Sequence, residues 1–342
     1  MLPIIGYCPL YRINRMTVTI RAQFRGRPHQ WNTTCNYSRS GTLILAPKRN
    51  FLGEERYITV EFFTKTALDA ALTAGNHLLG AYKRHHVEVY GSNTNTLSVS
   101  NRGLTKEITS IRDHEADKLI IDIISERHPD HNLLTEETGR LDNGSPYTWV
   151  IDPLDGSSNY VNHNPFFAVS ICLAYENKPI TGVVFAPFIE EIAVARRGHG
   201  CTLNGRPVSV SPTNELGKSY SVGCPGGDKN NLRFAKMSCA LTETIKDFRK
   251  MGSAAIESYT VAAGRVDSFV TLNISPWDIA AGALCVEEAG GKVTDFNGNP
   301  WDMTKSDVCM SNGLIHDAVL NQISIVNPNS ENYSENRLFV SP

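Results

Sequence analysis

Three groups of acidic residues stand beside strongly apolar stretches of this sequence, where carboxylates are uncommon. Glu136 follows "NLLT". Asp152 and Asp155 are the two aspartates of "TWVIDPLD", and Asp278 lies within "SPWDIAAG". A buried carboxylate is costly unless it is paired with a cation or bound to a metal ion. No Arg or Lys occurs in residues 141–177. Clustered carboxylates without basic partners indicate a hard divalent cation, Mg²⁺ above all.

Each acidic group also has a purely structural interpretation. Glu136 could lie in a solvated loop, and Asp155 with Gly156 could form an ordinary turn. Asp278 follows Pro276 and could be a favourable negative charge in the first turn of a helix. These interpretations do not explain why all three groups stand beside very apolar elements. The coincidence favours one shared metal site.

The stretch from Asp152 to Asn159 has the residue types to hold both metal ions and a phosphate. Pro153 lacks an N–H, so we expect the strand to stop there and a tight turn to point both aspartates and a backbone carbonyl at one volume. If a helix begins in the following Gly-Ser-Ser-Asn, its free N–H groups can bind a phosphate. Together these features predict metal-assisted hydrolysis of a phosphate ester, in which two ions ~3.5–4 Å apart activate water and stabilise the leaving oxygen.

Four motifs connect the sequence with a known family. "DPLDGSSN", "TEETG", "GSAA" and "PWDIAAGALCVEEAGG" resemble the inositol monophosphatase family of magnesium-dependent, lithium-sensitive phosphatases, in the same order and at similar separations. The match runs from about residue 60 to about residue 315. The resemblance implies an alternating αβαβα sandwich, two or three Mg²⁺ ions in each active site, and a homodimer.

The resemblance also implies a role for each residue of the site. The metal ligands are expected to be the carboxylates of Glu136, Asp152, Asp155 and Asp278 and the backbone carbonyl of Leu154. Asp152 is expected to bridge two ions. The expected catalytic residues are Glu136 and the pair that orients the attacking water, Asp113 and Ser157. The expected substrate contacts are the N–H groups of Gly156 and Ser157 for the phosphate, and Gly252, Ser253, Ala254 and Thr271 around the sugar or inositol ring.

The substrate is less well defined than the reaction. Thr271 stands seven residues before Asp278, where animal inositol monophosphatases have a glutamate that contacts inositol hydroxyls. We expect a small phosphorylated polyol, with inositol 1-phosphate first. Fructose 1,6-bisphosphate and 3'-phosphoadenosine 5'-phosphate or NADP are alternatives on the same fold. A protein that keeps the fold as a non-catalytic binding or regulatory module is an alternative of a different class.

Apolar periodicity and turn residues predict the elements that position these residues. We expect helices over 60–82 and 109–129, a loop over 91–103, a buried strand over 147–154, an antiparallel meander over 166–211, and a helix, a strand and a helix between 250 and 291. Mixed helix pairs and sheet sections indicate a layered α/β fold.

Composition is that of a globular protein with a core. The chain has 342 residues, 41% of them hydrophobic and 20% charged, with a net charge of −2. This balance favours neither nucleic acid nor a membrane surface as a partner, and no apolar run approaches the ~20 residues of a membrane span. The eight cysteines form no C-x-x-C pair, which fits a reducing, cytoplasmic location.

The first 53 residues differ from the rest of the chain. They contain no Asp or Glu and eight Arg or Lys, whereas residues 54–342 carry 25 basic and 35 acidic side chains. This leader resembles an organelle transit peptide, although a disordered tail or a start codon placed too early would look similar. We therefore expect a leader over 1–55, a phosphatase domain over 56–325 and a C-terminal tail over 326–342.

Overall fold

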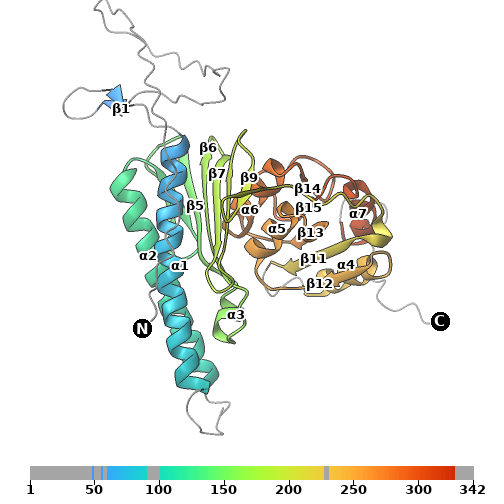
Figure 1. Ribbon diagram of the computed structural model, residues 1–342, viewed down its shortest axis with the longest axis horizontal. Helices are drawn as coiled ribbons and strands as arrows, with labels where there is room; N and C mark the ends of the chain where they lie inside the picture. The colour runs from blue at the N-terminus through green and yellow to red at the C-terminus, as the bar shows by residue number, and fades with distance from the viewer. Residues whose placement is uncertain (1–47, 50–54, 57–59, 91–100, 227–230, 328–342) are drawn as a thin grey trace, which may run out of the picture. The chain divides into compact units, whose positions relative to one another are not determined.

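Helices and sheets alternate in five layers in the computed structural model of the chain (Figure 1). The structure describes residues 48–49, 55–56, 60–90, 101–226 and 231–327, and these described residues belong to one compact unit. The layers are a helix pair, an eight-stranded sheet, a second helix pair, a five-stranded sheet and a third helix pair. The expected αβαβα sandwich is therefore confirmed.

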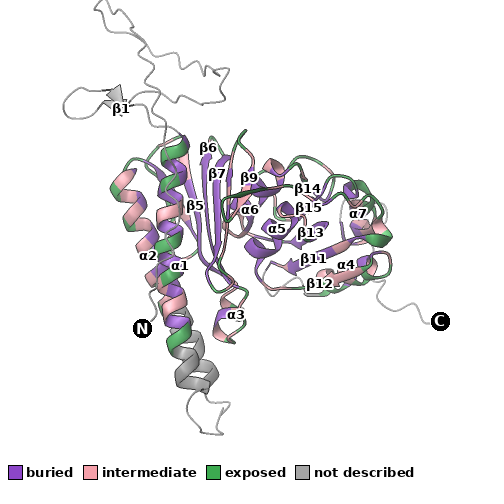
Figure 2. Cartoon of the chain, viewed as in Figure 1, coloured by how far each residue is buried: buried purple, intermediate pink, exposed green. Residues whose placement is uncertain are grey.

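The eight-stranded sheet carries the expected meander. Its spatial order is β10 (Arg206–Val208), β9 (Cys201–Leu203), β8 (Glu191–Arg196), β7 (Lys178–Ala186), β6 (Ala168–Tyr175), β5 (Tyr147–Asp155), β3 (Asn132–Thr135) and β4 (Gly139–Leu141). Neighbouring strands are antiparallel, except that β3 and β5 run parallel. β5, β6 and β7 are buried along most of their length (Figure 2), as their nearly continuous apolar sequences require.

The first helix pair covers one face of this sheet. It consists of α1 (Val60–Tyr90) and α2 (Asn101–Arg127). Phe63 and Leu78 of α1 and Ile120 of α2 are buried against Trp149 and Ile171 of the sheet. In the described parts of both helices, exposed and half-buried residues alternate with buried ones (Figure 2), which is the amphipathic pattern of a covering helix. None of the described helices combines the length and the apolar composition needed to cross a membrane.

The remaining layers lie on the other face of the eight-stranded sheet. The second helix pair, α5 (Ala254–Ala262) and α6 (Pro276–Glu288), is buried between the two sheets. The five-stranded sheet has the order β12 (Asp247–Arg249), β11 (Tyr220–Pro225), β13 (Ser268–Leu272), β15 (Val308–Ser311) and β14 (Lys292–Asp295). The third pair, α4 (Asn231–Thr242) and α7 (His316–Ile323), covers its outer face. The short elements are β1 (Lys48–Arg49), β2 (Glu55–Arg56), α3 (Ser157–Val161) and two 3₁₀ turns, η1 (Leu216–Lys218) and η3 (Ser324–Val326).

Several element boundaries differ from those expected. α1 continues to Tyr90 and α2 begins at Asn101, inside the stretch expected to be a loop; residues 91–100 lie outside the described residues. The prediction that β5 stops at Pro153 was wrong, because the strand continues to Asp155. A proline is tolerated there because the ladder is already interrupted by a bulge.

Gly182 on β7 allows α6 to lie against the sheet. A Cβ at this position would lie 2.9 Å from the carbonyl oxygen of Ala281 and 3.0 Å from its Cα atom. Because both neighbours are backbone atoms, Gly182→Ala must displace the helix, and we expect a loss of about 1–3 kcal/mol in the free energy of unfolding. Urea denaturation measures it. Gly80→Ala on α1, where the new methyl group would meet only the Arg84 side chain at 3.4 Å, is the matched control and should not destabilise.

Candidate active site

A bulge in β5 turns two aspartates toward the same layer. Asp152 pairs with Ser170 of β6 and Asp155 with Ala168, so three steps along β5 match two steps along β6. In a regular strand, the side chains of residues three apart point to opposite faces of the sheet. The extra residue of a bulge brings both side chains to the same face. Accordingly Leu154, two residues after Asp152, is buried on the opposite face, against α1 and α2. Both carboxylates therefore face α5 and α6.

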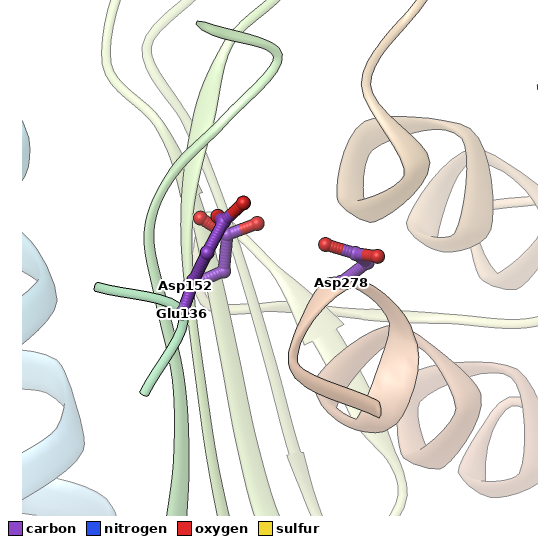
Figure 3. A group of neighbouring side chains, drawn as sticks. All are labelled: Glu136, Asp152 and Asp278. Carbon is purple, nitrogen blue, oxygen red and sulfur yellow. The ribbon is translucent and has the colours of Figure 1, made fainter. Parts of the chain in front are cut away.

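Three carboxylates from three elements meet at this edge of the sheet. Glu136 directly follows β3, Asp152 belongs to β5, and Asp278 lies in the first turn of α6. One oxygen of each lies within 4.8 Å of the others. Figure 3 shows Glu136 and Asp152 side by side, with Asp278 pointing toward them from its helix. We call Glu136, Asp152 and Asp278 the three-carboxylate group.

The three-carboxylate group is electrostatically unfavourable by itself. Burial and the neighbouring carboxylates raise the pKa of Asp152 well above its ordinary value. Burial, with Asp155 and Glu136, raises the pKa of Asp278 to about 8. Burial also raises the pKa of Glu136, although its side chain lies at the exposed mouth of the group. Buried like charges favour the protonated forms, so ionisation of all three requires a compensating positive charge.

A divalent cation fits this donor set. All three ligands are carboxylates, which hard cations prefer, and a positive ion would remove the repulsion that raises the pKa values. None of the ion pairs found among the described residues involves Glu136, Asp152 or Asp278. The structure therefore supplies a group that could hold a metal ion, as the sequence predicted for these three residues.

Asp155 lies beside this group but is held by helix α5. Its carboxylate accepts hydrogen bonds from the Ser253 hydroxyl, from the Ala254 N–H at 3.2 Å and from the Ala255 N–H at 2.8 Å. Burial raises its pKa to about 6, and these hydrogen bonds oppose the rise. Asp155 thus joins β5 to the start of α5 and is not one of the three converging carboxylates. Its role as a metal ligand stays a prediction.

The residues that follow β5 make a sharp turn. Gly156 has φ = 88°, and a Cβ there would lie 2.7 Å from the carbonyl oxygen of Phe166, so only glycine fits. The helix expected next is α3, a single short turn beginning at Ser157. The Ser157 hydroxyl donates to the Leu154 carbonyl at 2.9 Å. The expected phosphate turn, the expected water-orienting hydroxyl and the expected carbonyl ligand are therefore neighbours.

Gly156→Ala is expected to lower activity sharply. The added methyl group must displace the Phe166 backbone, and the backbone at φ = 88° is strained for alanine. A displacement of about 1 Å at a reacting centre can cost about 10²-fold in rate. Phosphate-release kinetics measure the loss, and Gly139→Ala is the control, because Gly139 also has positive φ (82°) but open space around its Cβ. Equal losses in both variants would contradict a local effect at the site.

A second turn, Met251 to Ser253, lies against the first. Gly252 has φ = 80°. Asn159 donates from Nδ2 to the carbonyls of Met251 at 2.8 Å and Gly252 at 3.1 Å. From the other side, Glu257 accepts from the Met251 and Gly252 N–H groups at 2.5 and 3.1 Å. The sequence interpretation named Gly252, Ser253 and Ala254 but missed Asn159 and Glu257, which hold the backbone of Met251 and Gly252.

Glu257 gave a signal in the sequence that could have been used. Its side chain is fully buried in α5, a helix whose described residues are all buried. Burial raises its pKa to about 7. A carboxylate in a helix buried on all sides needs specific donors, and the backbone of the adjacent turn provides them.

Asp113 of α2 faces the Glu136–Glu137 turn. It is 8% exposed, and its Oδ1 atom is buried without a hydrogen-bond partner among the described residues. Burial, with Glu137 and Glu136, raises its pKa to about 8. Such a carboxyl can accept a proton near neutral pH. The expected role of Asp113 in orienting the attacking water stays a prediction.

Thr271 differs from the expected ring contacts. It lies on β13 with a fully buried side chain, and its hydroxyl lies 3.9 Å from the Cys224 sulfur. A direct contact with substrate would require its neighbours to move. The geometry of Thr271 is that of a core residue of the five-stranded sheet.

Comparison with known proteins agrees with this geometry. The model of the inositol monophosphatase family matches residues 59–327. The chain is 35% identical over 263 residues to inositol-1-monophosphatase of Synechocystis, covering 75% of this chain and 87% of that protein. It is 36% identical over 261 residues to Nus factor SuhB of Pasteurella multocida, covering 75% of this chain and 94% of that protein.

A solved structure shows the same fold. The inositol monophosphatase from Anabaena matches with a TM-score of 0.67 and 34% identity, covering 79% of this chain and 98% of that one. The chain belongs to the inositol monophosphatase family. It is a phosphatase that hydrolyses phosphate monoesters.

Proposed function

We propose that this protein is a Mg²⁺-dependent phosphatase of a small phosphorylated polyol, with inositol 1-phosphate as the first candidate. The convergence of Glu136, Asp152 and Asp278 carries the proposal. These carboxylates, with Asp155 and the Leu154 carbonyl, would hold two or three Mg²⁺ ions. The Synechocystis relative's name supports the substrate, whereas the Pasteurella relative's name, Nus factor SuhB, specifies no phosphate ester.

When bound, the cations lower the pKa of water and stabilise negative charge on the phosphate. The chain's own residues do the positioning. Asp113 and Ser157 would orient the attacking water. The Oδ1 atom of Asp113 has no hydrogen-bond partner among the described residues and can accept a proton from that water. The Ser157 hydroxyl donates its hydrogen to the Leu154 carbonyl and offers a lone pair. The N–H groups of Gly156 and Ser157 face the phosphate.

The polyol would lie against the second turn. Asn159 and Glu257 hold Met251 and Gly252 from two sides, and Asp155 binds the Ser253 hydroxyl and the Ala254 N–H. A rigid turn favours recognition of a ring of defined shape, because little conformational entropy is lost on binding. We expect Thr271 to affect specificity only through the packing of β13.

A substrate panel tests this proposal. Phosphate release is measured with inositol 1-phosphate, fructose 1,6-bisphosphate, 3'-phosphoadenosine 5'-phosphate and NADP, each with Mg²⁺ and with EDTA. We expect Mg²⁺-dependent release with the highest kcat/KM for inositol 1-phosphate. A higher value for another ester would replace the substrate and keep the reaction. No release from any of the four would favour the non-catalytic binding or regulatory module.

We also propose a homodimer in a reducing, cytoplasmic environment. The dimer rests on the resemblance to the family alone. Among the described residues six cysteines are free thiols and five of these are buried, which supports a reducing compartment. The leader, residues 1–55, and the tail, residues 326–342, remain predictions as separate segments. Light scattering of the purified protein measures its mass in solution.

A further inference from the structure

Asp117 is a buried carboxylate next to the metal site with no role in the mechanism above. It lies one turn after Asp113 on α2 and is 2% exposed. Its Oδ2 atom accepts hydrogen bonds from the Thr138 hydroxyl at 2.5 Å and from the Thr135 hydroxyl at 3.4 Å. Its Oδ1 atom is buried without a partner in the described part of the chain. Burying a half-satisfied carboxyl is unfavourable, so its presence needs a reason.

The two threonines flank the turn that carries Glu136. Thr135 is the last residue of β3, and Thr138 precedes β4. The Thr138 N–H donates to the Thr135 hydroxyl oxygen at 2.8 Å, which closes the turn. Asp117 therefore binds both ends of the turn through one oxygen atom.

Glu136 is thereby held from two sides. Its own N–H donates to the carbonyl of Ile151 on β5 at 3.2 Å, which places its backbone beside Asp152. On the other side, Asp117 of α2 holds the turn through the threonine hydroxyls. Glu136 itself is exposed, so the position of its backbone helps to determine where its carboxylate points.

We propose that Asp117 is a positioning residue that holds the Thr135–Thr138 turn so that Glu136 stays directed at the cation. The inference rests on the proposed Mg²⁺-dependent function. Residues that orient metal ligands through hydrogen bonds typically contribute about 10–100-fold to metal affinity. A residue that only stabilised α2 would change thermal stability without changing the Mg²⁺ requirement.

The test compares Asp117→Ala with Asp117→Asn. We measure the Mg²⁺ concentration at half-maximal phosphate release and, without substrate, the Mg²⁺ concentration at half-maximal thermal stabilisation. Asp117→Ala should raise both by about tenfold or more. Asp117→Asn should stay close to wild type, because an amide oxygen in place of Oδ2 can accept from both threonines. An unchanged Mg²⁺ requirement in Asp117→Ala would overturn the proposal. Equal shifts in Asp117→Ala and Asp117→Asn would also overturn it, because the loss of the negative charge alone would then explain the effect.

Two further variants test whether Asp117 acts through the Thr135–Thr138 turn. Thr138→Val removes one hydrogen-bond donor to Asp117 without changing α2, and it should also raise the Mg²⁺ requirement. The test therefore remains possible if Asp117→Ala fails to fold. An unchanged Mg²⁺ requirement in Thr138→Val would count against the proposal. Asp267→Ala is the matched control, because Asp267 is buried and accepts from the Ser211 hydroxyl and the Tyr220 N–H far along the chain. It should lower thermal stability only. Wild-type protein without Mg²⁺-dependent release would overturn the proposed function, and the positioning role with it.

Discussion

We expect Asp152→Asn to lower the rate of phosphate release by at least about 10³-fold while the protein stays folded. Catalytic metal ions contribute several kcal/mol to such reactions, and each 1.36 kcal/mol is about tenfold in rate. Asp152 lies at the centre of the three-carboxylate group and contacts both partners. Its replacement by a neutral amide removes a ligand and leaves the shape of the side chain.

The variant should also be more stable than wild type when metal is absent. In metal-free wild type at pH 8, folding must either protonate Asp152 or ionise it beside Glu136 and Asp278, and both cost free energy. Asparagine removes this cost, so the melting temperature in EDTA should rise. Asp267→Asn, at a buried aspartate of similar exposure, serves as the control and should keep its activity. Activity of Asp152→Asn within tenfold of wild type would rule out the assignment of Asp152 as a metal ligand.

The stability of the metal-free protein should fall as pH rises from about 6.5 to 8. The pKa values of Asp113 and Asp278 are raised to about 8, and that of Asp152 is raised well above its ordinary value. The unfolded chain has already lost these protons at pH 6.5, so it binds fewer protons than the folded protein in this window. Stability then decreases with pH, by up to about 1.4 kcal/mol per pH unit for each such group.

One further carboxyl titrates in this window. Burial raises the pKa of Glu257 to about 7, so it adds to the fall in stability, with or without Mg²⁺. His316 has a pKa lowered by burial to about 4, so it increases stability as pH rises, but only up to the ordinary histidine value near 6.5. Carboxyls with lowered pKa values, such as Asp69 and Asp295, finish titrating below this range. Differential scanning calorimetry with EDTA measures the slope. Saturating Mg²⁺ should make the slope less steep, and an equally steep slope with Mg²⁺ would contradict binding at these carboxylates.

The sequence predicted that Glu136, Asp152 and Asp278 converge, but it did not predict the backbone geometry that brings them together. Acidic residues beside apolar stretches, and a phosphate turn after β5, were visible as patterns of residue type. The same patterns placed the end of β5 at Pro153, because the conformational preference of proline does not depend on how a neighbouring strand pairs. The bulge exists only in the pairing of β5 with β6. It could not be predicted from either strand by itself.

Long-range contacts explain what the sequence interpretation missed. Asn159 contacts Met251 and Gly252 across more than ninety residues, and no local pattern reports such a pair. Asp117 did leave a trace, because it stands on the buried stripe of α2 with Ile120 and Ile124, where a carboxylate is out of place. The five-stranded sheet was largely unrecognised, because its strands are short and separated by helices and long connections.

The bulge in β5 makes the site depend on how many residues the chain has at that point, as well as on which residues they are. Deleting one residue between Asp152 and Asp155 would keep every ligand type, yet Asp155 would then turn toward α1 and α2 and lose the start of α5. Compensation would need a second length change in β6, opposite it. Insertions and deletions within this short segment are therefore expected to be far more damaging than in the turn between β4 and β5, whose length no ligand depends on.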